Sequence, residues 1–191
     1  MSDVAGTNDY LYAGLVERKE EASINKAQQE ARGDISNPII RDIIPEIDFD
    51  AGDDTEWDGE AAGWVVSPDS DGPGEYEVYE VDSDTGRAER RVNVFYGFEA
   101  VENGSYVEQI NFKGADGQVF ERAKLTGLDE GGDSHMDRQR TLRSPIAFGP
   151  QDNGTIEIVV NEDYTASEDE IKLKLLGVTA EKQGRRVGSR T

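Results

Sequence analysis

The chain of 191 residues contains no cysteine and only one histidine, His135. Without cysteine, disulfides and thiolate metal sites are excluded. No apolar run approaches the length of a membrane span, and the first nine residues have neither the basic nor the apolar region of a secretory signal. We therefore expect a chain that is made as a soluble protein and folds without covalent cross-links.

Positive charge is also scarce, because 20 basic residues face 41 acidic ones and the formal net charge is −21. Self-repulsion of this size destabilises a compact state in dilute buffer, whereas molar salt shortens the screening length to about 3 Å. The profile, with only 7 lysines, resembles that of proteins from extreme halophiles. The alternative is an acidic protein that folds at ordinary salt concentration, or a partly disordered one. Regularly patterned apolar positions favour the halophilic interpretation.

The N-terminal arm, residues 1–36, contains a helical pattern over residues 9–32. Asn8 or Asp9 would cap the helix, and Gly33 would follow its end. A narrow apolar stripe cannot bury much surface, so this helix is expected to dock on its own domain or on a partner chain. The stripe consists of Leu11, Leu15, Ala22 and Ala27, widened by Val16 and Ile24.

Residues 37–182 consist of strand-like segments separated by glycine turns. Asn103-Gly104, Asp116-Gly117 and Asn153-Gly154 are typical hairpin dipeptides, because both of their residue types tolerate positive φ. Longer links at 128–141 and 163–169 alternate with these turns, which favours a Greek-key sandwich over an up-and-down barrel. The sequence therefore predicts an all-β fold, a single jelly-roll or β-sandwich domain of about eight strands preceded by an N-terminal helical arm. Further expected strands lie at 64–66, 76–81, 91–98, 106–112, 118–126, 142–148, 155–160 and 171–178.

The sequence contains few combinations of residues that would indicate catalysis. Ser134, His135 and Asp137 supply the residue types of a triad, but neighbours in one loop do not provide the geometry that a scaffold must hold. Carboxylate pairs for glycoside hydrolysis cannot be singled out among 41 acids. We expect no enzyme and no cofactor.

The turns and the aromatic residues suggest two other classes of ligand, calcium and carbohydrate. The stretch from Asp82 resembles a calcium loop, but positions six and twelve hold Arg87 and Asn93 in place of glycine and glutamate. No metal ligand is therefore named. Trp57 and Trp64 would form a sugar-stacking platform with several tyrosines, although alternating placement favours core positions for most of these rings. The tyrosines are Tyr76, Tyr79, Tyr96 and Tyr106.

The basic C-terminal tail, residues 183–191, is the clearest charge asymmetry of the chain. Arg185, Arg186 and Arg190 follow Lys182 without any acidic residue. Such a segment would contact anionic lipid, nucleic acid or an acidic face of a neighbouring subunit, or it is simply a frayed end. The acidic body itself would repel phosphate, so no direct nucleic-acid contact is expected from it.

The outline as a whole, including Ser144-Pro-Ile-Ala-Phe and the late strand from Ile171 to Val178, resembles a viral coat subunit. More narrowly, residues 37–182 resemble the smaller major capsid protein of haloarchaeal icosahedral viruses with an internal membrane. The resemblance implies a structural virion protein, made soluble in the host cytoplasm, that assembles with itself and with a second, related capsid protein. Arg185, Arg186 and Arg190 would then contact the internal membrane or a subunit. A minor capsid, spike or tail component and a halophilic carbohydrate-binding module are the alternatives.

Overall fold

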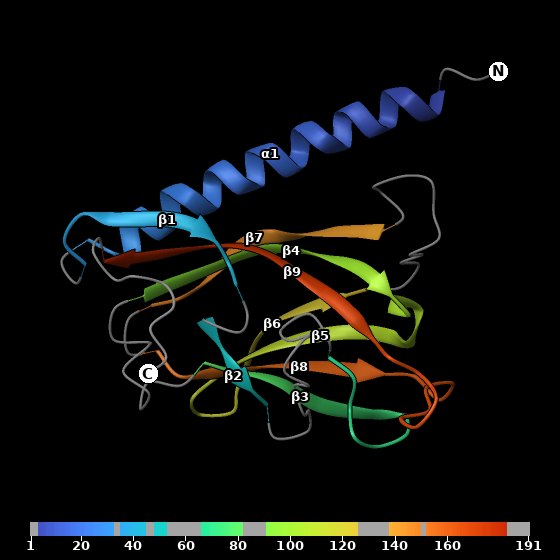
Figure 1. Ribbon diagram of the computed structural model, residues 1–191. Coiled ribbons are helices and arrows are strands. Elements are labelled where there is room, and N and C mark those ends of the chain that lie inside the picture. The colour runs from blue at the N-terminus through green and yellow to red at the C-terminus, as the bar shows by residue number, and fades with distance from the viewer. Residues whose placement is uncertain are drawn as a thin grey trace, which may run out of the picture.

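The computed structural model describes residues 4–32, 35–44, 48–52, 66–81, 91–125, 138–149 and 152–182. A long N-terminal helix precedes a body made of strands (Figure 1). A short 3₁₀ turn, Gly104–Tyr106, separates two of the strands. The elements are α1 (Val4–Glu30), β1 (Pro38–Asp42), β2 (Asp50–Ala51), β3 (Gly74–Val81), β4 (Arg91–Glu102), β5 (Val107–Gly114), β6 (Val119–Lys124), β7 (Gln139–Phe148), β8 (Gly154–Val160) and β9 (Lys172–Lys182).

The strands form two antiparallel sheets. The four-stranded sheet has the order β1-β9-β4-β7, and the five-stranded sheet has the order β2-β3-β8-β5-β6. Apart from the two-residue β2, the eight strands pair in a nested way, the first with the last: β1 with β9, β3 with β8, β4 with β7, and β5 with β6. This nesting is what results when a long two-stranded ribbon is folded over on itself, and it is the topology of a jelly roll. The predicted fold class is confirmed.

The main core lies between the two sheets and is rich in phenylalanine. Phe95 of β4 contacts Phe112 of β5 and Phe148 of β7, with ring centroids 5.7 and 6.0 Å apart. Phe49 and Phe98 extend the cluster, and these side chains are at most 3% exposed. Truncating a buried phenylalanine to alanine typically costs about 3–5 kcal/mol, so this cluster holds the two layers together.

Only one of the three expected hairpins is present. Asp116 and Gly117 join β5 to β6, where Gly117 has φ 72° and the Gly117 amide donates to the Gly114 carbonyl over 2.9 Å. Asn103-Gly104 and Asn153-Gly154 instead connect strands of different sheets, so the hairpin prediction was wrong there. Asn103 does adopt a positive φ of 52°. A turn dipeptide predicts that the chain reverses, but it does not determine which sheet the next strand joins.

Two other boundaries differ from the expectation. The helix begins at Val4, so Asn8 and Asp9 lie inside it and do not cap it. The strand expected at 64–66 is not supported at its last residue: Val66 has no strand assignment, although its amide donates to the Ile171 carbonyl over 2.9 Å. Gly33, Trp64 and Val65 lie outside the described residues.

Candidate assembly surface

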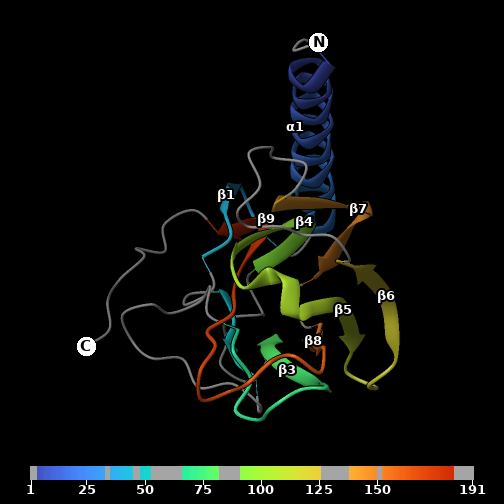
Figure 2. The same cartoon turned by 90° about the vertical axis from the view of Figure 1, so that its right-hand side faces the viewer.

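The C-terminal half of α1 packs on the outer face of the four-stranded sheet (Figures 1 and 2). Ala27 and Ala31 are fully buried there, and their small side chains let the helix backbone approach the sheet closely. The helix thereby covers an apolar patch of β4 and β9 that would otherwise face solvent. This second core consists of Ala27, Ala31, Ile35, Val92, Val94, Val178 and Ala180, with Ile24, Ile40 and Ala147 packed against it.

Two lysines fasten the helix to the edge strand β7. Lys19 Nζ donates to the Arg143 carbonyl over 2.5 Å, and Lys26 Nζ donates to the Pro145 carbonyl over 2.8 Å. The pairing of β4 with β7 jumps from Ile146 to Thr141, so the residues between them have no β4 partner in the ladder. The bulge in β7 therefore presents two backbone acceptors to the helix.

Tyr96 of β4 lies on the same outer face and is only 9% exposed. Burial is the main reason that its pKa is raised to about 12, and the nearby charges of Glu20, Asp42 and Glu99 add to the effect. The phenol therefore keeps its proton at a pH where an exposed tyrosine would lose it.

The N-terminal part of α1 extends beyond the sheet (Figures 1 and 2). Leu15 is 40% exposed and Ala22 is exposed, although both belong to the predicted apolar stripe. Ala27 and Ile24 do pack against the sheet, so the predicted stripe was only partly right. The predicted stripe thus combined two faces of the helix: Ile24 and Ala27 lie on the face that packs against the sheet, and Leu15 and Ala22 lie on an exposed face.

A buried ionic cluster lies on the opposite side of the four-stranded sheet. The Asp48 side chain is completely buried and accepts hydrogen bonds from both Nη atoms of Arg41 at 2.7 Å and from Arg91 Nη1 at 2.9 Å. It also accepts from the Ile44 amide at 2.8 Å and from Thr179 Oγ1 at 3.2 Å. A single carboxylate thus joins a loop to β1, β4 and β9.

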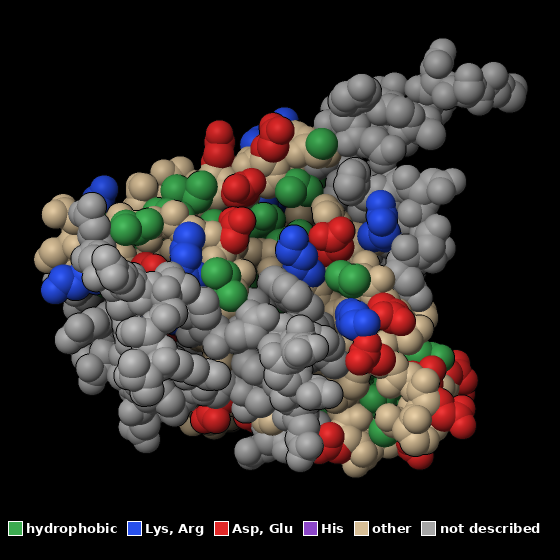
Figure 3. Space-filling model, viewed as in Figure 1, with side chains coloured by type: hydrophobic (Ala, Val, Ile, Leu, Met, Phe, Trp, Pro, Cys, Tyr) green, Lys and Arg blue, Asp and Glu red, His purple; other side chains and the backbone are tan. Residues whose placement is uncertain are grey.

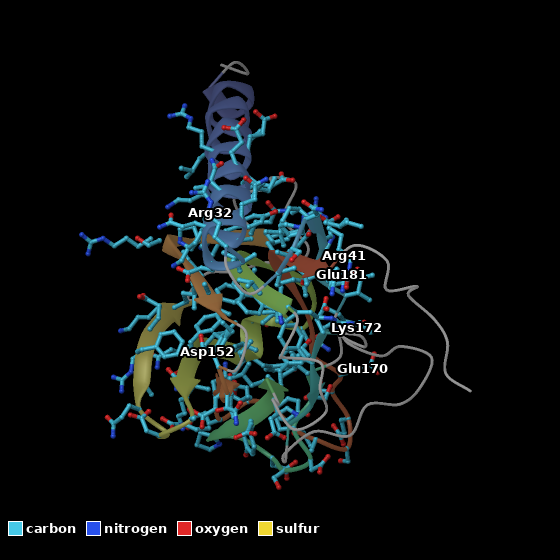
Figure 4. All side chains as sticks on the ribbon, turned by 90° about the vertical axis from the view of Figure 1, so that its left-hand side faces the viewer. Arg32, Arg41, Asp152, Glu170, Lys172 and Glu181 are labelled. Atoms are coloured by element: carbon cyan, nitrogen blue, oxygen red, sulfur yellow. The ribbon has the colours of Figure 1, made fainter. Side chains whose placement is uncertain are left out.

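Glu181 completes the cluster from β9. Its Oε2 atom lies 3.2 Å from Arg41 Nη2 and 3.6 Å from Arg91 Nε, and Figure 4 shows Arg41 beside Glu181. Burial by itself would lower the pKa of Arg41, but hydrogen bonds and charge from Asp48 and Glu181 outweigh it and raise that pKa. Two arginines and two carboxylates balance, so the cluster carries no net charge. It fixes the end of β9, after which the basic tail follows.

The outer face of the five-stranded sheet is polar and carries its own side-chain network. Glu157 of β8 pairs with Lys113 and lies 3.5 Å from Asn111 Nδ2, and Gln109 Nε2 donates to Asn111 Oδ1 over 2.6 Å. The two sheets thus differ, since a helix covers the four-stranded sheet whereas hydrogen-bonded polar side chains cover the five-stranded one. On the side of the molecule shown in Figure 3, acidic and basic side chains are interspersed with scattered hydrophobic ones.

A hollow of about 550 Å³ lies beside β3 and β8. Four carboxylates contribute to its lining, and no lysine, arginine or histidine does. Within the described residues, no group of three or more His, Cys, Asp or Glu side chains is arranged to hold a metal ion. The described residues around the hollow therefore include neither a nucleophile paired with a basic side chain nor a group that could hold a metal ion. Its lining residues are Pro73, Gly74, Glu75, Glu108, Val159, Val160, Asn161, Glu162 and Asp163.

The tyrosines considered for sugar stacking do not share a face. Tyr79 is 1% exposed in the main core, where Tyr76 and Tyr106 pack against it, whereas Tyr96 lies on the helix side of the four-stranded sheet. These tyrosines form no platform. The other residues considered at the sequence level lie outside the described part of the chain: Trp57, Trp64, Ser134, His135, Asp137, Arg185, Arg186 and Arg190.

The ionic cluster was not predicted from the sequence. Arg91 and Glu181 stand within otherwise apolar, alternating strands, on positions that face the same side as Phe95. A charge on the core-facing phase of a strand predicts a buried partner, and this signal was available in the sequence.

Comparisons of the chain with protein-family models, with curated proteins and with solved structures gave no match. Among the described residues, no helix combines the length and the apolar character that crossing a membrane requires.

Proposed function

We propose that the protein is a structural capsid subunit of a halophilic virus. In this proposal it assembles with itself and with a second, related coat protein into the capsomers of an icosahedral shell over an internal membrane. The body contributes no catalysis, and its role is to present surfaces that fit neighbouring subunits.

The observation that carries the proposal is the combination of the nested strand order with a helix that extends past its own sheet. Jelly rolls with this order form the shells of many viruses, but also lectins and cupins, so the fold by itself does not decide the function. A helix that projects beyond the body favours assembly, because the projecting part has no sheet of its own to cover.

The charge of the chain fits assembly in concentrated salt. Subunits that each carry a net charge of −21 repel one another at low ionic strength. Molar salt screens this repulsion except between charges that are nearly in contact. Shell formation is therefore expected to require high salt and to reverse on dilution.

Sedimentation of the native protein from its source lysate in molar salt tests the proposal. We expect co-migration with a large particle, and release of subunits after dilution to low salt. Negative-stain imaging of the particle fraction would then show closed shells. A monomer at both salt concentrations, in a lysate that contains intact virus particles, would contradict a role in the shell.

The basic tail provides a second test within the same proposal. If Arg185, Arg186 and Arg190 contact the internal membrane, deletion of residues 183–191 should lower the lipid content of purified particles. Replacing the three arginines by glutamine keeps the length of the tail and serves as the matched variant. Unchanged particle yield together with unchanged lipid content would show that the tail has no such role.

A further inference from the structure

The part of α1 beyond the sheet differs in composition from the rest of the helix. Residues 4–16 contain one charged residue, Asp9, whereas residues 17–32 contain eight. In a chain that is 32% charged, this is an unusually uncharged segment. Because copies of the chain repel one another elsewhere, the segment is a place where two copies can approach at little electrostatic cost.

An outer stripe runs along this part of the helix, defined by positions 4, 8, 11, 15, 18 and 22. The spacing of three and four residues keeps these positions on one side of an α-helix, and 18 residues make about five turns. Leu15, Arg18 and Ala22 are all exposed, whereas Ser23, Ala27 and Ala31 are buried. Leu15, Arg18 and Ala22 therefore face away from the sheet, and helix geometry places positions 4, 8 and 11 along the same side of the backbone.

The outer stripe is self-complementary when read in opposite directions. Its residues are Val4, Asn8, Leu11, Leu15, Arg18 and Ala22. In an antiparallel pair centred between positions 11 and 15, Leu11 of one helix lies opposite Leu15 of the other. Val4 then lies opposite Ala22, and Asn8 lies opposite Arg18, whose guanidinium can donate to the carboxamide oxygen. Apolar residues thus meet apolar ones, and polar residues meet polar ones.

We propose that two copies of the chain associate through an antiparallel pairing of their outer stripes. The arrangement has two-fold symmetry, so both copies use the same surface. It places the two acidic bodies at opposite ends of the helix pair, whereas a parallel pair would place them side by side. A polar pair at Asn8 and Arg18 fixes the register, as single polar residues do in coiled coils.

The dimer supplies a contact between subunits for the proposed shell, but its formation does not require a shell. Four apolar side chains from each helix make a small interface, below the roughly 1,200 Å² that stable complexes bury. The dimer is therefore expected at high protein concentration or where many copies are held close together. Molar salt should strengthen it by screening the bodies from each other.

Cysteine trapping in the full chain tests the pairing directly, since the natural sequence contains no cysteine. Leu11→Cys and Leu15→Cys are made separately, and one of them carries an affinity tag. Each protein alone and an equimolar mixture are oxidised in molar salt. We expect the mixed disulfide to exceed either homodisulfide several-fold. Homodisulfides in excess would establish a parallel pair, and a yield no higher than that of Gln28→Cys would exclude the pairing.

Sedimentation equilibrium provides the second measurement. Leu15→Glu should weaken the dimer roughly tenfold or more, which corresponds to at least about 1.4 kcal/mol. Gln28→Glu adds the same charge at an exposed helix position off the stripe and should leave the dimer unchanged. Equal effects of the two variants would overturn the proposal. If Leu15→Glu abolishes the dimer but shells still form, the proposed shell function stands without this contact. If dimers form but shells never do, the helix pairing stands without the proposed shell function.

Discussion

Replacing Asp48 by asparagine should destabilise the fold more than any surface charge change. The carboxylate is completely buried and accepts from Arg41, Arg91, the Ile44 amide and Thr179. Asparagine keeps the size of the side chain but removes the negative charge, so two partly or fully buried guanidinium groups are left with one carboxylate, Glu181. Breaking a buried ion pair on one side typically costs about 3–5 kcal/mol.

We expect a loss near the lower end of that range, about 3 kcal/mol. Arg41 retains 16% exposure and can be partly hydrated, and Glu181 still neutralises part of the charge. Urea unfolding at a fixed molar salt concentration, followed by far-ultraviolet circular dichroism, gives the free energy of unfolding. The matched control is Glu102→Gln, which removes an exposed partner of Lys172 at 2.7 Å. Surface pairs of this kind contribute little, so the control should remain close to the natural protein.

A loss below about 1 kcal/mol for Asp48→Asn would refute this reasoning, because it would mean that the arginines are solvated or re-paired at little cost. A loss that disappears in molar salt would refute it too, since buried pairs are screened much less than exposed ones. Combining Asp48→Asn with Glu181→Gln tests whether Glu181 compensates for the charge that Asp48 has lost. If Glu181 compensates, the double variant should lose more than the sum of the single ones.

Three further outcomes follow from the same structure. Lowering the salt from molar to about 0.1 M should lower the melting temperature in a calorimetric scan, because screening of the −21 charge is lost, and an unchanged melting temperature would contradict this. Ala27→Asp should detach α1 while the sandwich persists, because a carboxylate cannot be buried unpaired against Val94; hydrogen exchange should rise in residues 19–31 but not in β5. Tyr96, with its pKa raised from 10.0 to about 12, keeps its proton in the folded protein at a pH where the unfolded chain has lost it. The stability that is fully present below pH 10 should therefore fall between pH 10 and 12. In urea titrations Tyr96→Phe should make this fall less steep, and an unchanged slope would contradict the prediction.

Most of the fold was predictable, because alternating strands separated by turn residues restrict the chain to a few all-β architectures. Long links among short ones pointed to the jelly roll. The links at Asn103 and Asn153, which cross between the two sheets and form no hairpins, were not predictable in the same way. The positive φ that these residues tolerate is a local preference. Which sheet the next strand joins depends on how Phe95, Phe112 and Phe148 pack together in the core.

The packing of α1 on the sheet and the ionic cluster were less predictable from the sequence. The stripe that included Ala22 and Ala27 mixed two faces of the helix, because a loose apolar pattern does not say which face the sheet selects. Lys19 and Lys26 donate to carbonyls of a bulge in β7, and no local pattern in the sequence indicates that bulge. Asp48 lies more than forty residues from Arg91 and over a hundred from Glu181, so only the folded chain brings them together.

The nested strand order has a consequence for the timing of folding. Among the nested pairings of the described strands, only β5 and β6 are joined by a short local turn, and the other three bring together segments that are far apart in the chain. Such topologies fold slowly, because the entropy of closing large loops is lost before the contacts form. The sheet on which α1 docks contains β9, so the helix acquires its platform only when the last strand has paired. In the proposed assembly, a subunit would therefore present a fixed arm to its neighbours only after its own body has folded, and the order of strand pairing would limit premature association.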